Sequence, residues 1–532
     1  MNPRLVLTRL RLLAGEHKLF TGALAVGATL RLLASVAYPG ALWFAGDSYV
    51  YLGAALRPQP NLSKSTGYSL FLRLLLPFHS LTLVTALQHL MGLTVAVLIY
   101  LLLRRSKVSK TWSAIATLPV LLDGYIIEDE HLVMAETVFT FALMVAVTLL
   151  LWRPKPAWVP AVLAGLLAGF AVIVRTEGAV MLAVLPLFLL LRGFAWKTLR
   201  GWLVAIVFAV ASVVPVGAYA AWFHQRTGHY GVSMSTGFYL WGRVSSFADC
   251  ARIKPAGLEA KVCPAEPLAK RTPPGNFVWH APEVHAVKGT DGKIHGSQYM
   301  YDTGGPVTPA NNTLLTHFAE HAVEAQPLDY AKTLFFNTMM SFGFPRIAYP
   351  GAGTTYYYSF HLHYVVGGKH PYNLLPPKNH AWISPIIVPK YSAYDDWVNY
   401  GHQAPGVVHK VAAVPILIYQ RVVFTYGPLL ALIFLVGLGG LIGVRRRGRP
   451  VKSLRLHWAP RGTTMLPWVT AVALLLTPVA LADFDYRYLL PAIPFACLAA
   501  GLAFAPRRAA PAAPTAPAAP ESVESTVPDQ VA

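Results

Sequence analysis

The feature that most constrains this chain is a series of long apolar runs, most of them ended by a short cluster of basic residues. Runs of about 20 residues are long enough to cross the hydrocarbon core of a bilayer as helices. The chain has 55% hydrophobic and 13% charged residues, whereas a soluble domain usually has about 25% charged residues. The sequence therefore predicts an all-α polytopic membrane protein.

About ten runs qualify as transmembrane helices. They cover approximately residues 19–38, 80–103, 111–127, 132–152, 157–174, 179–191, 201–222, 424–444, 464–482 and 489–504. With the N-terminus in the cytoplasm, this count places basic clusters such as 445–449 inside and acidic clusters such as 128–130 outside, as the positive-inside rule requires. Since no small-residue cleavage site clearly follows the first run, we expect it to be retained as a helix.

The predicted helices divide the chain into four parts. Residues 1–223 form an N-terminal transmembrane module, and residues 224–410 form a mixed external domain without a spanning run. Residues 411–508 hold the C-terminal transmembrane helices, preceded over about 407–423 by a helix that we expect to lie at the membrane interface. The Pro- and Ala-rich segment 509–532 is expected to be a disordered cytoplasmic tail.

The net charge of +20 raises the question of a nucleic-acid partner. Such a partner requires basic residues gathered on one face of a soluble domain. Here the basic residues fall in short loops between apolar runs, which is the pattern of a membrane protein. We therefore expect no nucleic-acid partner.

The external segment holds two cysteines and several histidines. Cys250 and Cys263 lie where thiols can oxidise, and we expect a disulfide between them. The histidine spacing matches no closed zinc site, so we predict no metal ligands and no certain cofactor, with a divalent metal left open as the alternative. The histidines concerned are His361, His363, His370 and His380.

Ionisable residues from distant loops are predicted to meet at the outer membrane boundary. Asp47 lies just past the first span and is followed by Tyr49 and Tyr51. The others are Glu128, Asp129, Glu130, Arg175, Glu177, Asp483, Asp485 and Arg487. Each alone could be a solvated loop residue or an interfacial anchor. Together, carboxylates and arginines on one rim suit a reaction that needs a base and a cationic site for a phosphate leaving group.

Four short motifs, in this order, carry a family resemblance. They are residues 46–51 followed by 66–70, residues 131–136, residues 164–177, and residues 486–494. This set resembles the GT-C superfamily of glycosyltransferases, particularly the polyprenyl- or dolichyl-phosphate-mannose-dependent protein mannosyltransferases and bacterial relatives such as the aminoarabinose transferases. The chain departs from the family at Thr66-Gly67, where a proline commonly precedes the turn tyrosine.

The resemblance implies a GT-C-like fold and an inverting transfer of a sugar from a polyprenyl-phosphate donor to an external hydroxyl acceptor on a protein, glycan or lipid. It makes Asp47 the catalytic base, because a hydroxyl group is a poor nucleophile until its proton is removed. Four basic residues are candidates for binding the donor phosphate: Arg175, Arg487, Lys64 and Arg57. Tyr49 and Tyr51 would position the base, Glu128 or Asp129 would orient the acceptor or a neighbouring arginine, and Glu136 would be structural, paired with a basic residue.

Localisation and two alternative functions complete the sequence-based hypotheses. Heavy use of Ala, Arg, Pro and Leu suggests a GC-rich bacterium, so we expect the plasma membrane, with the active site on the extracytoplasmic face. A transporter or flippase for a lipid-linked or polar substrate would place ionisable residues at mid-membrane, whereas the predicted spans are almost free of charge. A non-catalytic membrane scaffold is the third class, and it would tolerate the loss of Asp47.

Overall fold

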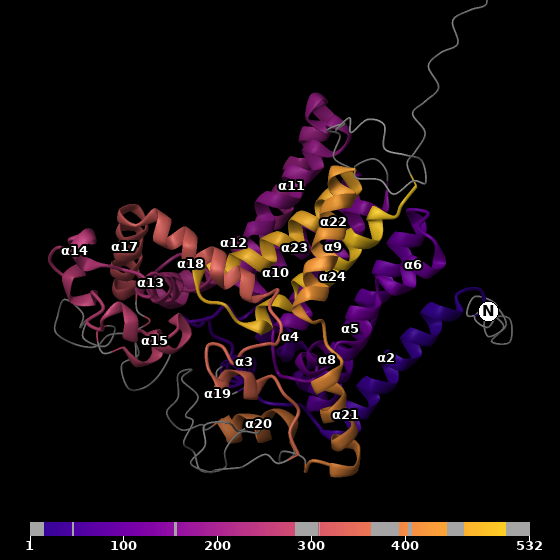
Figure 1. Cartoon of the computed structure of the whole chain (residues 1–532), viewed down its shortest axis with the longest axis horizontal. Helices are drawn as coiled ribbons and strands as arrows, with labels where there is room; N and C mark the ends of the chain where they lie inside the picture. The colour runs from indigo at the N-terminus through magenta and orange to yellow at the C-terminus, as the bar shows by residue number, and fades with distance from the viewer. Residues whose placement is uncertain are drawn as a thin grey trace, which may run out of the picture.

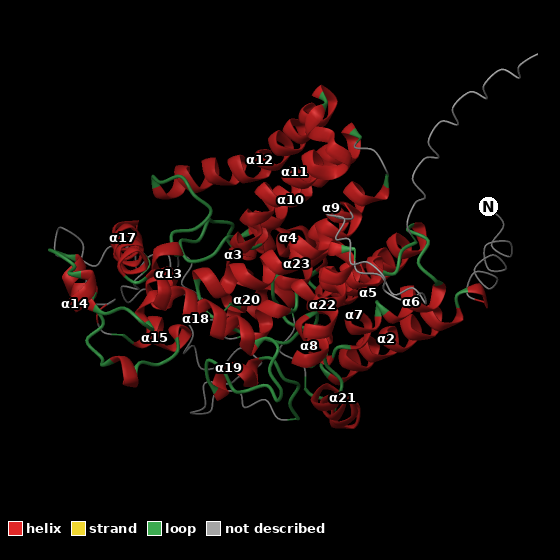
Figure 2. Ribbon diagram, turned by 45° about the horizontal axis from the view of Figure 1, so that its top comes forward, coloured by secondary structure: helices red, strands yellow, loops and turns green. Residues whose placement is uncertain are grey.

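The structure is a computed structural model that describes residues 15–44, 47–153, 157–281, 283, 307, 309–362, 393–402, 407–443 and 462–506. Regular structure in these residues is helical and includes no strand (Figure 2), which confirms the all-α prediction. An isolated parallel bridge joins Leu42 to Leu132. This bridge holds the segment before Asp47 beside the segment that follows the acidic cluster 128–130.

The helices of the N-terminal half run in a nearly continuous series. They are α2 (Lys18–Ala37), α3 (Ser48–Leu56), α4 (Gly67–Leu75), α5 (Leu81–Arg105), α6 (Lys110–Ile115), α7 (Leu118–Leu122), α8 (Gly124–Asp129), α9 (Glu136–Trp152), α10 (Trp158–Val174), η2 (Thr176–Val180), α11 (Met181–Leu191), η3 (Arg192–Lys197) and α12 (Leu199–Thr227).

The remaining helices are shorter until the chain re-enters the bundle. They are α13 (Thr236–Ser245), α14 (Cys250–Ile253), α15 (Pro274–His280), α17 (Pro309–Ala325), α18 (Pro327–Met340), α19 (Ala352–Tyr357), α20 (Ala393–Gly401), α21 (Lys410–Val422), α22 (Gly427–Ile442), α23 (Gly462–Leu481), η7 (Tyr486–Leu489) and α24 (Ala492–Ala503). Figure 1 shows α13, α14, α15 and α17 together on one side of the bundle.

Five helical segments of the described chain are long and apolar enough to cross a membrane. They are α2, α5, α12, residues 463–481 of α23, and η7 with α24. Helices α21 and α22 add a sixth if they count as one span, although they meet at a bend of 58°, and α4, α9, α10 and η2 with α11 belong to shorter apolar stretches. The protein is therefore a multi-pass membrane protein, and the count of ten spans stays a prediction.

The predicted span over residues 111–127 is wrong as a single helix, because the structure breaks it into α6, α7 and α8. Pro119 lies in the first turn of α7, where a proline is tolerated. Asp123 then caps α8 by accepting from the backbone N–H groups of Tyr125 and Ile126 at 2.9 and 3.4 Å. The other Asp123 oxygen accepts from the N–H of Thr425 at 2.7 Å, so the break is fixed by a distant segment.

The loop predicted between the first two spans contains α3 and α4. The N-terminus of α4 packs so closely against the end of α10 that a Cβ atom on Gly67 would lie 2.4 Å from the carbonyl oxygen of Ile173. Only glycine permits this approach. The contact brings Lys64, just before α4, to the same region as Arg175, just after α10.

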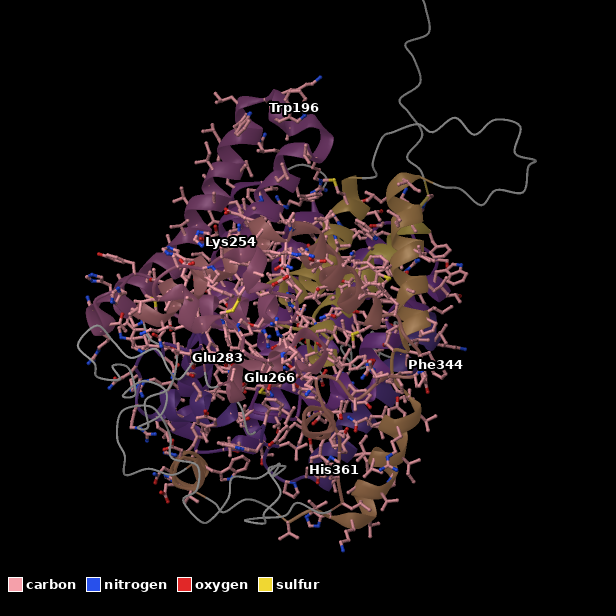
Figure 3. The ribbon with its side chains drawn as sticks, turned by 60° about the vertical axis from the view of Figure 1, so that its left-hand side comes forward. Trp196, Lys254, Glu266, Glu283, Phe344 and His361 are labelled. Atoms are coloured by element: carbon pink, nitrogen blue, oxygen red, sulfur yellow. A yellow bond between two sulfur atoms is a disulfide. The ribbon has the colours of Figure 1, made fainter. Side chains whose placement is uncertain are left out.

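The segment 224–410 divides between two locations. Its first helices, α13, α15 and α17, share a separate hydrophobic core with the end of α12, built around Phe223, Trp241 and Phe318. A disulfide joins Cys250 to Cys263 in this part, visible as a yellow bond in Figure 3. Helix α18 instead contacts α23, and α20 contacts α3. The described residues of the segment are thus helices and loops that partly cover the membrane bundle.

A buried ion pair ties the core formed by α12, α13, α15 and α17 to the turn between α23 and η7. Arg243 of α13 is fully buried and donates to Asp483 and to the carbonyl of Ala482, each at 3.1 Å. Asp483 also accepts from the N–H of Gly275 at 2.6 Å and from the Tyr349 hydroxyl at 3.0 Å. This contact fixes the turn that carries Arg487.

Candidate active site

Asp47 lies between two cations from different parts of the chain. Its Oδ1 atom contacts the Lys64 ammonium, and its Oδ2 atom accepts from Arg487 at 2.9 Å. The carboxyl group is buried, with 6% of the residue exposed. Asp47 is the residue before α3, so backbone geometry at a helix start sets its direction.

Glu136 connects this pair to a second arginine. The Glu136 Oε1 atom contacts the Arg175 guanidinium and lies 3.2 Å from Nε of Arg487. Arg175 also pairs with Glu177 at 2.8 Å. We call Asp47, Lys64, Glu136, Arg175 and Arg487 the Asp47 cluster. Five residues from five segments thus form one continuous chain of opposite charges, and Glu136 has the basic partners that the sequence analysis expected for it.

Aromatic rings and one further carboxylate hold Arg487 in place. Its guanidinium lies 4.8 Å from the centre of the Phe44 ring and 5.0 Å from that of Tyr488. Asp485 accepts from the backbone N–H of Arg487 at 3.0 Å and from the Tyr358 hydroxyl at 2.7 Å. Arginine stacked in this way directs its N–H edge at polar partners, which here are Asp47, Glu136 and the Tyr488 hydroxyl.

The charges of the cluster shift the pKa values of its members. Burial alone would raise the pKa of Asp47, but Lys64 and Arg487 outweigh it and hold that pKa well below its usual value. Burial lowers the pKa of Lys64, and Asp47 partly restores it. Asp485 shows the opposite balance to Asp47, since burial outweighs Arg487 and raises its pKa to about 6.

The other predicted site residues fall in three places. Tyr49 and Tyr51 are buried on the first turns of α3, and Tyr51 packs edge-on against Tyr68 at 5.0 Å. Arg57 pairs through both terminal nitrogens with Asp396 of α20, at 2.6 and 2.7 Å, so the structure engages it in a different ion pair from the Asp47 cluster. Glu128 and Asp129 line a cavity beside Arg487.

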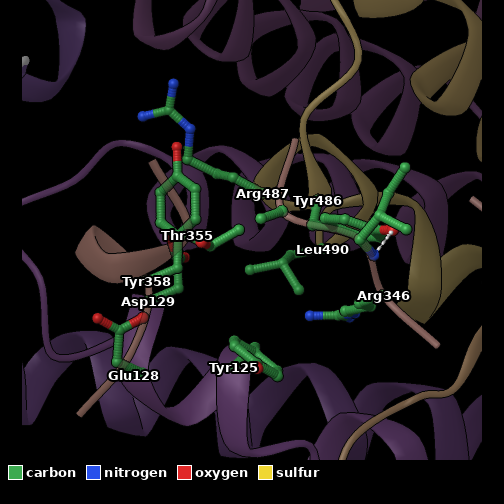
Figure 4. Close-up of a pocket in the computed structure, with 11 residues that line it drawn as sticks. Tyr125, Glu128, Asp129, Arg346, Thr355, Tyr358, Tyr486, Arg487 and Leu490 are labelled. Atoms are coloured by element: carbon green, nitrogen blue, oxygen red, sulfur yellow. Dashed lines mark hydrogen bonds between the residues drawn. The ribbon is translucent and has the colours of Figure 1, made fainter. Parts of the chain in front are cut away.

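This cavity also contains a residue that the sequence analysis did not single out, Arg346. Figure 4 shows its guanidinium directed inward, with Glu128 across the cavity. The only signal in the sequence is a lone arginine after Pro345 in an aromatic-rich stretch, which is too weak to select it.

Glu130, the third acid of the predicted cluster, lies in a separate buried network. Its carboxylate receives two bonds of 2.7 Å from Arg31 of α2 and lies 2.9 Å from Nδ1 of His89 in α5. Nε2 of His89 lies 3.0 Å from Nδ1 of His131, whose Nε2 donates to the carbonyl of Tyr38 at 2.8 Å. We call Arg31, His89, Glu130 and His131 the Glu130 network.

Among the residues that the structure describes, no group of three or more His, Cys, Asp or Glu side chains is placed to hold a metal ion. His363, His370 and His380 lie outside the described residues. His361 contacts Tyr356, stacking on its ring at 3.6 Å and lying 2.9 Å from its carbonyl oxygen.

One comparison with known proteins identifies a family for part of the chain. Residues 62–231 match the family model of dolichyl-phosphate-mannose-protein mannosyltransferases. This match confirms the resemblance to the GT-C glycosyltransferases, over the segment that carries Lys64, Glu136 and Arg175. No curated protein matches the chain.

A solved structure also aligns with most of the chain. It is the apo form of the oligosaccharyltransferase of Archaeoglobus fulgidus, with 12% identity and a TM-score of 0.39, covering 91% of this chain and 50% of that protein. The chain therefore spans about half the length of that structure, and a likeness at this level defines neither fold nor function.

Proposed function

We propose that this protein is a membrane glycosyltransferase that moves a sugar from a polyprenyl-phosphate donor to a hydroxyl group of a protein, glycan or lipid, on the extracytoplasmic face of a bacterial plasma membrane. The observation that carries the proposal is the position of Asp47 between Lys64 and Arg487. A base and a cationic phosphate site are in direct contact there. The family match at residues 62–231 supports the same reaction class.

The proposed reaction is a direct displacement with inversion. The acceptor oxygen forms a bond to the anomeric carbon while the bond from that carbon to the phosphate oxygen breaks. Asp47 takes the hydroxyl proton, and the lipid phosphate leaves with the electron pair of the broken bond. Arg487, Lys64 and Arg175 stabilise the charge that develops on this phosphate.

The ion pairs of Asp47 also provide a way to couple donor binding to base strength. With both cations on its oxygens, Asp47 has a lowered pKa and is a weak base. A donor phosphate competes for Lys64 and Arg487, and as these cations turn to the phosphate, the pKa of Asp47 rises. The base is then strongest when the donor is in place.

Replacing Asp47 tests the proposal. Purified Asp47→Asn in detergent should transfer sugar from radiolabelled polyprenyl-phosphate mannose, arabinofuranose or aminoarabinose about 10²–10⁴-fold more slowly than wild type, because the general base is lost. Asp329→Asn, which changes a partly exposed carboxylate paired with Arg252 on the surface, is the matched control and should keep wild-type activity.

Melting temperatures of both variants establish that they are folded. Wild-type protein that transfers none of the three sugars, or transfer that is indifferent to Asp47, would contradict the proposal. Either result would favour the transporter or the scaffold.

A further inference from the structure

The cavity beside Arg487 has the size of a small polar ligand. Its volume is about 190 Å³. Pockets that hold drug-sized ligands have volumes of roughly 300–1,000 Å³. The cavity therefore has room for one small ring rather than for a lipid chain or an oligosaccharide.

One wall of the cavity presents buried acceptors that lack partners. Glu128 and Asp129 are 1% and 5% exposed. Among the described residues, Oε1 of Glu128 and Oδ1 of Asp129 have no hydrogen-bond partner. Buried polar atoms are almost always hydrogen-bonded, so these oxygens indicate a ligand that supplies donors.

The opposite wall presents a cation whose faces are covered. The Arg346 guanidinium lies 4.3 Å from the ring centre of Tyr125, 4.7 Å from that of Phe424 and 4.8 Å from that of Tyr486. Tyr486 itself is held by its hydroxyl group, which accepts from the N–H of Ile347 at 3.1 Å, the dashed line in Figure 4. The guanidinium of Arg346 is directed into the cavity, where its N–H groups can donate to a ligand.

An anion confined to the cavity would meet the acidic side chains of Glu128 and Asp129, and a metal cation would meet Arg346 and Arg487. A neutral molecule rich in hydroxyl groups satisfies both walls, because each hydroxyl both donates and accepts hydrogen bonds. The apolar faces of Tyr125, Tyr358 and Leu490 suit the C–H face of a ring.

We infer that this cavity binds the sugar ring of the polyprenyl-phosphate donor, with Glu128 and Asp129 accepting from its hydroxyl groups and Arg346 donating to its oxygens. The inference rests on the proposed function. Arg487 connects the cavity to the Asp47 cluster, since it lines the cavity while its guanidinium pairs with Asp47. A phosphate held by that guanidinium has its sugar one bond away. Glu128 and Asp129 thereby contact the donor sugar rather than the acceptor, and Arg346 becomes a specificity residue.

Binding of donors with and without their sugar tests this inference without requiring an acceptor. The full chain in lipid nanodiscs is titrated with polyprenyl-phosphate mannose and with polyprenyl phosphate, and the arabinofuranose and aminoarabinose carriers follow. Arg346→Gln and Glu128→Gln should each weaken the tightest sugar-bearing ligand about tenfold, because each leaves a sugar hydroxyl without its charged partner. Both variants should bind polyprenyl phosphate within about twofold of wild type.

Three further variants make the result specific. Arg346→Lys keeps the positive charge but loses the planar fork, and it should fold like wild type while still losing sugar-dependent affinity. Arg487→Gln should weaken both ligands, because it touches the phosphate. Arg252→Gln, on the exposed surface of α14, should weaken neither.

Several outcomes would overturn the inference. One is equal loss of both ligands in Arg346→Gln, and another is wild-type protein that binds none of the sugar-bearing carriers more tightly than polyprenyl phosphate. A third is variants that bind donors normally but fail in transfer, which would place the acceptor in the cavity. Wild-type protein that binds no ligand of either kind would instead overturn the proposed function itself.

Discussion

The Asp47 cluster and the Glu130 network are both buried groups of charges drawn from distant segments, but they differ in how completely their polar atoms are satisfied. Each of the five guanidinium N–H donors of Arg31 has an acceptor, on Glu130, Gly27, Leu121 and Val120. In the Asp47 cluster, the Oε1 atom of Glu136 contacts two arginines, yet among the described residues neither carboxylate oxygen of Glu136 has a well-aligned hydrogen bond.

Under the proposed function, this difference separates a structural group of charges from a reactive one. A saturated network has no bond left to offer a ligand, so it can only hold its helices together. A network with strained or missing bonds can exchange partners when a substrate arrives. The same contrast distinguishes Glu130 from its neighbour Glu128, which lines the cavity and whose Oε1 atom has no hydrogen-bond partner among the described residues.

The strongest test of the comparison removes the cation of the Glu130 network. Arg31→Met should lower the free energy of unfolding by about 3–5 kcal/mol, because a buried carboxylate loses its main counter-ion. The rate of sugar transfer per folded molecule should stay unchanged. Unfolding in denaturant, compared with transfer by the folded fraction, measures both effects. A variant that is stable but inactive would show that the Glu130 network takes part in the chemistry.

The converse test removes the cation shared by the Asp47 cluster and the cavity. Arg487→Gln should lower kcat/KM about 10²–10³-fold, since a charge opposite the leaving phosphate is lost. It should remain folded, because Asp47 keeps Lys64 and Glu136 keeps Arg175. Arg57→Gln, which breaks the pair with Asp396, is the matched control and should change transfer by less than about twofold. Equal losses of kcat/KM in the two variants would contradict the distinction between catalytic and structural arginines.

The smallest expected effect is on the pH dependence of stability and of sugar transfer. This pH dependence distinguishes the role of Asp485 from that of Asp47. In the folded protein the pKa of Asp485 is raised to about 6, above the ordinary value of about 3.9. The folded state therefore binds this proton more tightly than the unfolded chain, and the contribution of Asp485 to stability falls as pH rises from about 4 to about 6. Transfer should show the reverse trend, because the ionised carboxylate is the form that attracts Arg487.

We expect kcat/KM to fall about tenfold per pH unit below about pH 6. Asp47 should cause no further fall in kcat/KM in this pH range, because its two cations keep it ionised in the free enzyme. Asp485→Asn should abolish the fall in kcat/KM at acid pH. If the fall persists in this variant, another group causes it. The charged or titratable groups facing Asp485 are Arg487, Tyr358, Tyr488 and Asp483.

The sequence predicts the long helices well because length and apolar composition decide them locally. The runs 80–103 and 201–222 correspond to α5 and α12 within a few residues at most ends. The run 111–127 fails for a non-local reason. Its break depends on Asp123 binding the backbone of Thr425, 302 residues away, and no local pattern encodes that partner.

The candidate site also has residues whose position the sequence predicts and residues whose roles it does not. Placing Asp47, Arg175 and Arg487 on one rim follows from topology, and the structure brings them into one cluster. The sequence cannot distinguish Lys64 from Arg57, because both are basic residues of the same loop. Their roles separate only through Asp396, which lies 339 residues from Arg57.

The distance along the chain between Asp47 and Arg487 has a consequence for biosynthesis. The two residues are 440 positions apart, and at roughly 5–20 residues per second the second emerges about 20–90 s after the first. Of the two cations that contact Asp47, Lys64 and Arg487, only Lys64 has been synthesised before that time. Under the proposed function, a nascent or truncated chain that ends before η7 therefore has the base without a complete phosphate site. The proposed active site is assembled only when the last helix is inserted.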